Sequence, residues 1–210
     1  MQEIKTKDVS ETNSPEKHGF MEIRPQRELS LADEQKFAEI ESNYYTSYKE
    51  RIDKTPVKPE FGKWEGERGE SKFVPSAETE RGQRGIEKLA EYGLDGIEFR
   101  HGEPDYSKCS EATVKIDNMT ENRPYNFAQA DITLSDRWNE MAKDGRTDWN
   151  KDVIEEFRKE NKLSWHECCD RETMQLVSQD IHGNDTSVFP HLGGVSECKT
   201  RDNSGGEFDE

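Results

Sequence analysis

Apolar side chains recur every three or four positions between residues 30 and 52. The side chains that follow this spacing are Phe37, Ile40, Tyr44, Tyr48 and Ile52. The spacing predicts an amphipathic helix whose apolar face packs against the rest of the protein. Ser30 and Asp33 form a pair suited to cap its start, and Pro56 and Pro59 end the helix and make a linker.

Three further helices are predicted downstream. The first covers about residues 80–92, with Gly93 at its C-cap. The second covers about residues 124–142, and the third, capped by Thr147, covers about residues 148–160. The buried face of the second helix consists of Phe127, Ala130, Leu134, Trp138 and Met141. The third helix is expected to bury Trp149, Ile154 and Phe157.

Short apolar runs bounded by polar turns predict four strands. They are residues 97–100, 113–116, 163–167 and 173–177. Ser178 follows the last strand and is expected to cap a short helix that carries Asp180 and His182. The glycine-rich segment 61–71 is predicted to form turns with Trp64 packed down, since it lacks the residue order of a phosphate-binding loop.

These elements predict an α+β fold in which helices precede a C-terminal β-hairpin and a short helix. Residues 1–29 are polar and aperiodic, so we expect a disordered or loosely attached arm there. The amphipathic helix and its linker occupy residues 30–60. One domain is predicted over residues 61–201, with its core at 161–201, and an acidic tail follows at 202–210.

The composition is polar and acidic. The 210 residues are 30% hydrophobic and 36% charged, with a net charge of −16, so we expect a small core that a bound metal would help to organise. The charge argues against nucleic-acid binding, because phosphate recognition usually produces a basic surface. A nucleic-acid site would need local cations, for which the candidates are Arg100, Arg123, Arg171 and Arg201. The alternative is that these arginines pair with surface carboxylates, and that the excess charge serves solubility or another partner.

The four cysteines are Cys109, Cys168, Cys169 and Cys198. They show no C-x-x-C spacing and predict no disulfide framework. Reduced thiols are expected, and the alternative is a structural zinc that uses Cys168 or Cys169 with Cys198. The sequence contains no apolar run near about 18 residues and no signal peptide at its N-terminus. We therefore expect a soluble chain without a membrane partner, whose export would need another route.

Three of the five histidines, His166, His182 and His191, fall within 26 residues. His166 lies on a predicted strand and His182 on the predicted short helix. Imidazole and carboxylate groups are the ligands that catalytic divalent metals use in proteins. The segment therefore predicts one divalent metal, either zinc, nickel, manganese or magnesium, beside a general base.

A series of ordered motifs surrounds these histidines. Trp165-His166-Glu167 is followed by T-M-Q-L-V at 173–177, D-I-H at 180–182 and H-L-G-G-V-S at 191–196. Upstream are G-I-E-F-R-H-G-E-P-D-Y-S at 96–107, V-K-I at 114–116, M-T-E-N-R at 119–123 and N-F-A-Q-A-D at 126–131. Over roughly residues 61–201 the chain resembles the HNH/endonuclease VII superfamily of bacterial toxin nucleases, in the branch with a Trp-His-His signature. The resemblance implies a ββα-metal (His-Me finger) catalytic core at 161–201.

In that superfamily a metal binds a phosphate oxygen while a strand histidine activates water. The resemblance implies His182 and His191 as metal ligands and His166 as the base, with Asp180 either capping the short helix or supporting a ligand. Glu167 stands where the second histidine is usual. It either supports the site while His166 is the base, or takes the water proton while His166 binds the metal. Adjacent strand residues point to opposite faces, so only one of the two is expected to face the metal directly.

Substrate contacts are expected from Arg100, Arg123 and Arg171. Asp105, in the P-D-Y-S segment, either touches substrate or belongs to a packed turn. The resemblance also implies a nucleic-acid substrate, DNA in preference to RNA, and a cognate immunity protein. The expected setting is a bacterial protein, either cytoplasmic or delivered as an effector.

Three functions follow from these patterns. The first is a metal-dependent endonuclease, a DNase that acts as a bacterial toxin. The second is a catalytically inactive nuclease scaffold that binds a protein partner through the helix of residues 30–52, suggested by the acidic charge and by Glu167. The third is a structural zinc module that uses the cysteines and histidines.

Overall fold

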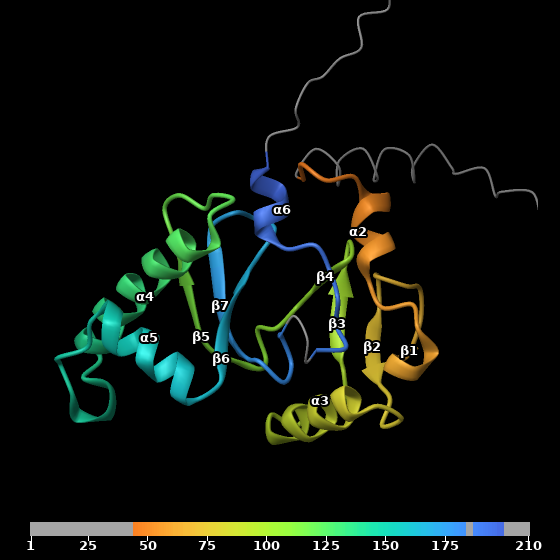
Figure 1. Ribbon diagram of the computed structural model, residues 1–210, viewed down its shortest axis with the longest axis horizontal. Helices are drawn as coiled ribbons and strands as arrows, with labels where there is room; N and C mark the ends of the chain where they lie inside the picture. Colours follow the sequence, from red (N-terminus) through yellow and green to blue (C-terminus); the bar gives the residue numbers. More distant parts are fainter. Residues whose placement is uncertain (1–43, 184–186, 200–210) are drawn as a thin grey trace, which may run out of the picture.

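Two antiparallel sheets and the helices around them make up the residues that the computed structural model describes, 44–183 and 187–199. In chain order the elements are α2 (Tyr48–Lys54), a 3-10 turn (Pro59–Phe61), β1 (Gly62–Trp64), β2 (Lys72–Pro75), α3 (Glu80–Glu91), β3 (Ile97–Arg100), β4 (Glu103–Pro104), β5 (Ser110–Lys115), α4 (Arg123–Glu140), a second 3-10 turn (Lys143–Gly145), α5 (Lys151–Glu160), β6 (Leu163–Glu167), β7 (Thr173–Ser178) and α6 (Gly194–Cys198). Figure 1 shows α3 below the sheets and α2 and α6 above them. The predicted α+β fold class is confirmed.

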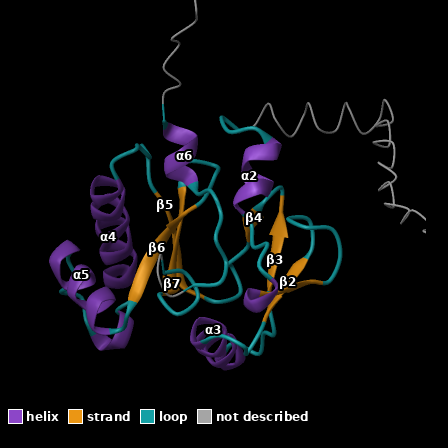
Figure 2. Cartoon of the chain, turned by 45° about the vertical axis from the view of Figure 1, so that its right-hand side comes forward, coloured by secondary structure: helices purple, strands orange, loops and turns teal. Residues whose placement is uncertain are grey.

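The predicted C-terminal hairpin forms part of a three-stranded sheet with strand order β5-β7-β6. β6 pairs antiparallel with β7, and His166 lies opposite Gln175. β7 also pairs with β5, so a strand from the middle of the chain extends the hairpin. α4 and α5 lie together beside this sheet (Figure 2). The hairpin is therefore supported by helices that precede it in sequence.

Apolar side chains of α4 and α5 fill the core between these helices and the sheet. The most completely buried of them are Ala130, Leu134 and Trp138 on α4 and Ile154 on α5. Burial of a large aliphatic or aromatic side chain contributes about 1.5–3 kcal/mol, so this core anchors the strand that carries His166. Met141 was predicted to join the buried face, but it is 65% exposed because α4 ends at Glu140.

The second sheet has the strand order β1-β2-β3-β4. The prediction of turns over residues 61–71 is wrong in part, because residues 62–64 form β1 and pair with β2. Aromatic packing supports this pairing: the Trp64 ring centroid lies 5.0 Å from those of both Phe73 and Phe99. A strand of three residues shows too little alternation to be recognised from sequence.

Most helices begin and end close to their predicted positions. Gly93 follows α3 with a φ of +70°, the left-handed conformation expected there. The predicted start of α5 is wrong, because Asn150 and not Thr147 caps it; the Asn150 side chain accepts hydrogen bonds from the N–H groups of Asp152 and Val153. None of the helices in the described ranges is long and apolar enough to cross a membrane.

The helix predicted over residues 30–52 lies mostly outside the described residues, together with its capping pair, the predicted arm and tail, and Arg201. Its described part corrects the prediction, because residues 44–47 are not helical and α2 begins at Tyr48. Ser47 caps α2 in a capping box with Glu50. A capping residue at this position keeps the helix from extending further back.

The short helix predicted directly after β7 is a single turn. The N–H groups of Ile181 and His182 both donate to the Ser178 carbonyl. Gly183 follows at once, and glycine disfavours the continuation of a helix. The short helix that follows the hairpin is instead α6, whose N-cap is Gly193.

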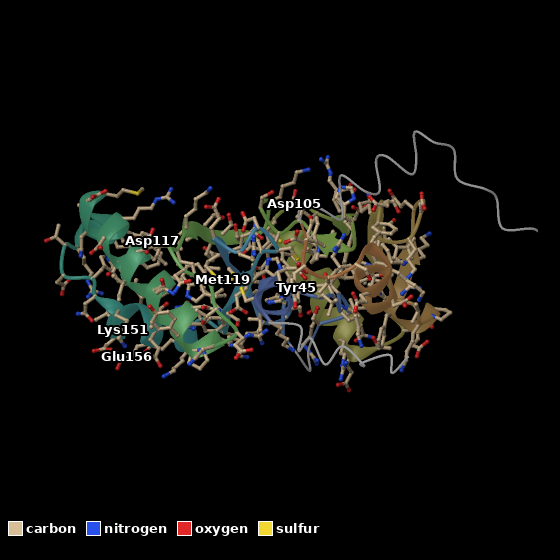
Figure 3. All side chains as sticks on the ribbon, turned by 90° about the horizontal axis from the view of Figure 1, so that it is seen from above. Tyr45, Asp105, Asp117, Met119, Lys151 and Glu156 are labelled. Carbon is tan, nitrogen blue, oxygen red and sulfur yellow. The ribbon has the colours of Figure 1, made fainter. Side chains whose placement is uncertain are left out.

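The residues before α2 hold α6 in place. The buried carboxylate of Glu197 on α6 accepts hydrogen bonds from the N–H groups of Tyr45 and Thr46 and from the Thr46 hydroxyl. Figure 3 labels Tyr45 and Met119 on the two sides of α6. The start of the described chain therefore fixes the segment that follows His191.

Candidate active site

Three imidazole rings meet where β6, the turn after β7 and the segment before α6 come together. The ring centroids of His166 and His182 are 4.9 Å apart, those of His166 and His191 are 5.0 Å apart, and those of His182 and His191 are 5.3 Å apart. His166 is buried, and the other two side chains are partly exposed. The structure thus brings together the three histidines that the sequence singled out.

Two of the histidines already use one ring nitrogen within the protein. His166 Nδ1 lies 3.1 Å from the side-chain oxygen of Gln175, and His191 Nδ1 lies 2.8 Å from the carbonyl oxygen of Phe189. Both oxygens favour the tautomer with a proton on Nδ1, which leaves the Nε2 lone pair free. His166 Nε2 is buried without a hydrogen-bond partner among the described residues. A buried lone pair of this kind suits a metal ion.

Tyr106 lies against all three rings. Its ring centroid is 4.9 Å from that of His166, 5.3 Å from that of His182 and 6.1 Å from that of His191. The side chain is fully buried, and its hydroxyl finds no partner within residues 44–183 and 187–199. The P-D-Y-S segment therefore contributes packing through Tyr106, and this packing restricts how the imidazoles can turn.

Burial keeps the three imidazoles neutral. Burial, followed by the proximity of His191, lowers the pKa of His166 from its usual 6.5 to about 3. Burial also lowers the pKa of His191 to about 4 and that of His182 well below its usual value. A metal binds neutral imidazole, because a protonated ring has no free lone pair. At neutral pH the three rings are thus neutral, the protonation state that metal binding would need.

Glu167 ends β6 beside the cluster, with 3% of its side chain exposed. One carboxylate oxygen accepts a hydrogen bond from Asn126 Nδ2 at 2.8 Å, and the other accepts one from Arg123 Nε at 2.8 Å. Burial raises the pKa of Glu167, while the hydrogen bond from Asn126 and the charge of Arg123 oppose that rise. The first turn of α4 supplies both partners and so sets the direction of the carboxylate.

The histidines and Glu167 line a single cavity. Among residues 44–183 and 187–199 its lining is Phe61, Arg81, Arg123, His166, Glu167, His182, Gly183, Ser187, Phe189, Pro190, His191 and Gly193. His166 and Glu167 both reach it, although neighbouring strand residues usually point to opposite faces. Gly193 packs against the end of β6, since a Cβ atom there would lie 3.1 Å from the Glu167 carbonyl oxygen. This close approach brings the segment of His191 next to the strand of His166.

The chain from β3 to the residue before α6 matches a known family. Residues 96–193 match the model of the DNase/tRNase domain of colicin-like bacteriocin. The match implies a bacterial nuclease toxin with a nucleic-acid substrate. It supports the resemblance to toxin nucleases, over a shorter span than residues 61–201. No curated protein matches the chain significantly.

This colicin-like segment, residues 96–193, holds the histidine cluster and Glu167 but not the whole cavity. Phe61 and Arg81 complete the wall from earlier in the chain. The residues around the colicin-like segment therefore help to shape its candidate active site.

The other predicted site residues lie elsewhere. The Asp180 carboxylate is 3.6 Å from an arginine nitrogen of α3 and does not line the cavity. Arg100 and Asp105 line a second cavity. Arg171 is exposed in the turn between β6 and β7. Of the four predicted substrate contacts, Arg123 alone lines the cavity with the histidines.

Four residues of the site were missed in the sequence: Arg81, Tyr106, Asn126 and Gln175. Asn126 begins the N-F-A-Q-A-D motif, so the resemblance contained a signal for it. Gln175 lies opposite His166 in the hairpin register, and correct pairing of the two predicted strands identifies it. Arg81 had no signal, because its approach to the cavity depends on tertiary packing.

Within the described part of the chain, no three histidine, cysteine, aspartate or glutamate side chains form a ready metal site. The three imidazole rings converge without forming such a site. The four cysteines are free thiols. Cys169 Sγ and Cys198 Sγ donate to the carbonyls of Leu192 and Met119 respectively, so these two thiols face different groups.

Glu103 lies in the wall of the second cavity, and its carboxyl group has a raised pKa. It accepts a hydrogen bond from the Cys169 N–H at 2.7 Å. Burial raises its pKa from 4.5 to about 7, with the charges of Asp170 and Glu197 adding to the rise and the Cys169 hydrogen bond opposing it. The folded protein thus keeps a proton that the unfolded chain releases at lower pH.

Wild-type protein is expected to lose stability relative to Glu103→Gln as the pH rises from about 4.5 to about 7. Over that range the folded state binds more protons than the unfolded state, so the free energy of unfolding falls with rising pH. Gln keeps the acceptor oxygen and cannot ionise. Urea unfolding at about pH 5 and about pH 8 measures the difference, with Glu98→Gln on the exposed side of β3 as control. An equal pH response of wild type and Glu103→Gln would contradict the prediction.

Proposed function

We propose that this protein is a metal-dependent endonuclease of the HNH type that hydrolyses phosphodiester bonds in DNA. The observation that carries the proposal is the convergence of three neutral imidazoles beside the buried carboxylate of Glu167 in one cavity. The colicin-like match supports a nuclease toxin; DNA as substrate and the metal are proposals beyond it. A cognate immunity protein is proposed as the partner, because a nuclease toxin also endangers the cell that makes it.

His166, His182 and His191 would hold one divalent cation, with Nε2 as the ligating atom of His166 and His191. Bound there, such a cation supplies Lewis acidity toward a phosphate oxygen and stabilises charge on the departing oxygen. Gln175 and the Phe189 carbonyl orient two of the rings through Nδ1, as groups around metal ligands commonly do. His166 is assigned to the metal and not to proton transfer, because burial lowers its pKa to about 3 and makes the ring a poor proton acceptor at neutral pH.

Glu167 is assigned as the general base. Burial raises its pKa, and a more basic carboxylate is a better proton acceptor. Asn126 and Arg123 each occupy one oxygen, and each oxygen retains a lone pair for water. The water proton moves to Glu167 while the water oxygen bonds to phosphorus and the P–O3′ bond breaks. Arg123 has about half of its side chain exposed, 49%, and is placed to contact a substrate phosphate as well.

A second candidate function is a protein-interaction module on an inactive nuclease scaffold. Glu167 in place of the usual histidine favours it, because the ion pair with Arg123 competes with proton transfer. This candidate predicts a folded protein that binds metal and cleaves no nucleic acid.

Plasmid cleavage by the full-length protein tests the proposal. Wild type, His182→Ala and a control, His101→Ala, are compared in magnesium, manganese, nickel and zinc, with and without chelator. His101 pairs with Glu70 away from the cavity, so this control removes a histidine without touching the cluster. We expect cleavage by wild type and His101→Ala, and none by His182→Ala or with chelator.

The other outcomes separate the alternatives. Cleavage of tRNA but not of plasmid would change the substrate to RNA. Cleavage that persists with chelator would overturn the metal dependence. Metal binding by calorimetry without cleavage of either substrate would favour the inactive scaffold.

A further inference from the structure

One wall of the cavity comes from outside the colicin-like segment and has no assigned role. Arg81 lies in the first turn of α3 and lines the cavity together with the histidines. α3 is packed against the turn that carries His182: a Cβ atom at Gly85 would lie 3.8 Å from the Asp180 carbonyl oxygen. Figure 1 shows α3 below both sheets, next to this turn. Arg81 is thus held beside the candidate active site by α3, a helix that precedes the colicin-like segment.

Arg81 differs from the neighbouring arginines in having no partner among the residues that the structure describes. Its side chain forms no ion pair and no hydrogen bond with any residue in the described ranges. Arg84, one turn further along α3, lies near the carboxylates of Glu80 and Asp180. Arg123, across the cavity, donates to Glu167. In a chain with a net charge of −16, an unpaired guanidinium in the cavity wall is available to an anion from outside the protein.

We propose that Arg81 binds a phosphodiester group of the nucleic acid next to the one that is cleaved. This inference rests on the proposed function and extends it to a residue outside the colicin-like segment. Guanidinium presents a planar fork of donors that matches two phosphate oxygens. Arg123 shares its charge between Glu167 and the proposed phosphate contact, whereas Arg81 has no partner among the described residues and can direct its whole charge to a phosphate.

The acidic charge of the protein makes such a contact important. A net charge of −16 repels a polyanion, so binding depends on a few local cations. Each phosphate that a cation neutralises releases counterions and adds about 0.9 to the slope of log affinity against log salt concentration. Loss of Arg81 should therefore lower both the affinity and its dependence on salt.

Binding of fluorescently labelled DNA, measured by anisotropy at several salt concentrations, tests the proposal. Chelator in the buffer prevents cleavage during the measurement. We expect Arg81→Gln to weaken binding on the order of tenfold and to reduce the salt slope by about 1. Arg81→Lys keeps the charge and should retain the salt slope. Arg84→Gln, on the same helix and already near carboxylates, is the matched control and should bind like wild type.

Steady-state cleavage gives a second readout. Arg81→Gln should raise KM with little change in kcat, because this contact is made equally before and during bond breaking. Equal affinity and equal salt slope for wild type and Arg81→Gln would overturn the phosphate contact and leave the proposed nuclease standing. Failure of wild-type protein to bind or cleave any nucleic acid would overturn both. Urea unfolding of each variant shows whether a loss of binding comes from misfolding.

Discussion

Glu167→Gln is expected to lower the turnover number for DNA cleavage on the order of 10²- to 10⁴-fold, the usual contribution of a general base. The amide has nearly the same shape, and its oxygen can still accept a hydrogen bond from Asn126 or Arg123. It cannot take a proton from water. Metal affinity, measured by calorimetry, should stay close to that of wild type, because the proposed ligands are histidines. Single-turnover cleavage with saturating protein isolates the chemical step.

The same experiment separates the two possible roles of His166. His166→Ala is expected to lose metal affinity together with turnover, whereas Glu167→Gln loses turnover alone. If His166→Ala binds metal normally and Glu167→Gln cleaves at the wild-type rate, His166 is the base and Glu167 a supporting group. Glu172→Gln, an exposed carboxylate in the same hairpin, controls for the change in charge.

Asp131→Ala is expected to lower the free energy of unfolding by about 3–5 kcal/mol, because it leaves a buried guanidinium without its partner. The Asp131 carboxylate accepts hydrogen bonds from Arg158 Nε at 2.7 Å and from Arg158 Nη2 at 2.6 Å. It also accepts one from Trp165 Nε1 at 2.8 Å. All three side chains are buried, so loss of the carboxylate leaves the donors of Arg158 and Trp165 without their acceptor.

Urea unfolding measures this loss. Asp136→Ala, at an exposed position of the same helix, should change stability by no more than about 0.5 kcal/mol. Replacing Asp131 and Arg158 together by leucine should recover part of the stability, because no unpaired charge remains. An Asp131→Ala loss no larger than that of Asp136→Ala would show that the network contributes little. The network joins α4, α5 and β6, and Trp165 directly precedes His166, so it also supports the site.

Local sequence patterns were sufficient for much of the fold. The strand of residues 163–167 has the predicted bounds, and α3 and α4 lie close to theirs. These elements depend on neighbouring residues along the chain, through periodicity and capping. These patterns were insufficient in two places. β1 has only three residues, too few for a pattern, and Asn150 lies so close to Thr147 that either residue could cap α5.

The candidate active site was likewise predictable from the sequence only in part. The spacing of the histidines and the motifs around Trp165 were sufficient to group His166, Glu167, His182 and His191, because these residues fall on a hairpin and the loop that follows it. The sequence alone left the roles of His166 and Glu167 open. Tertiary structure supplied the observations that favour one assignment: burial makes His166 a weak base, and α4 holds the Glu167 carboxylate.

Only the tertiary structure decided which distant residues surround the histidines. Arg81 and Tyr106 come from separate elements far upstream of the hairpin, and Asp180, near in sequence to His182, faces α3 instead. The physical reason is that short-range periodicity and capping specify elements, whereas the packing of one element on another sets side-chain direction. The cluster of histidines can therefore be predicted from the sequence. The charges, the hydrogen bonds and the cavity walls around the cluster form only when α3, α4 and α6 are packed in place.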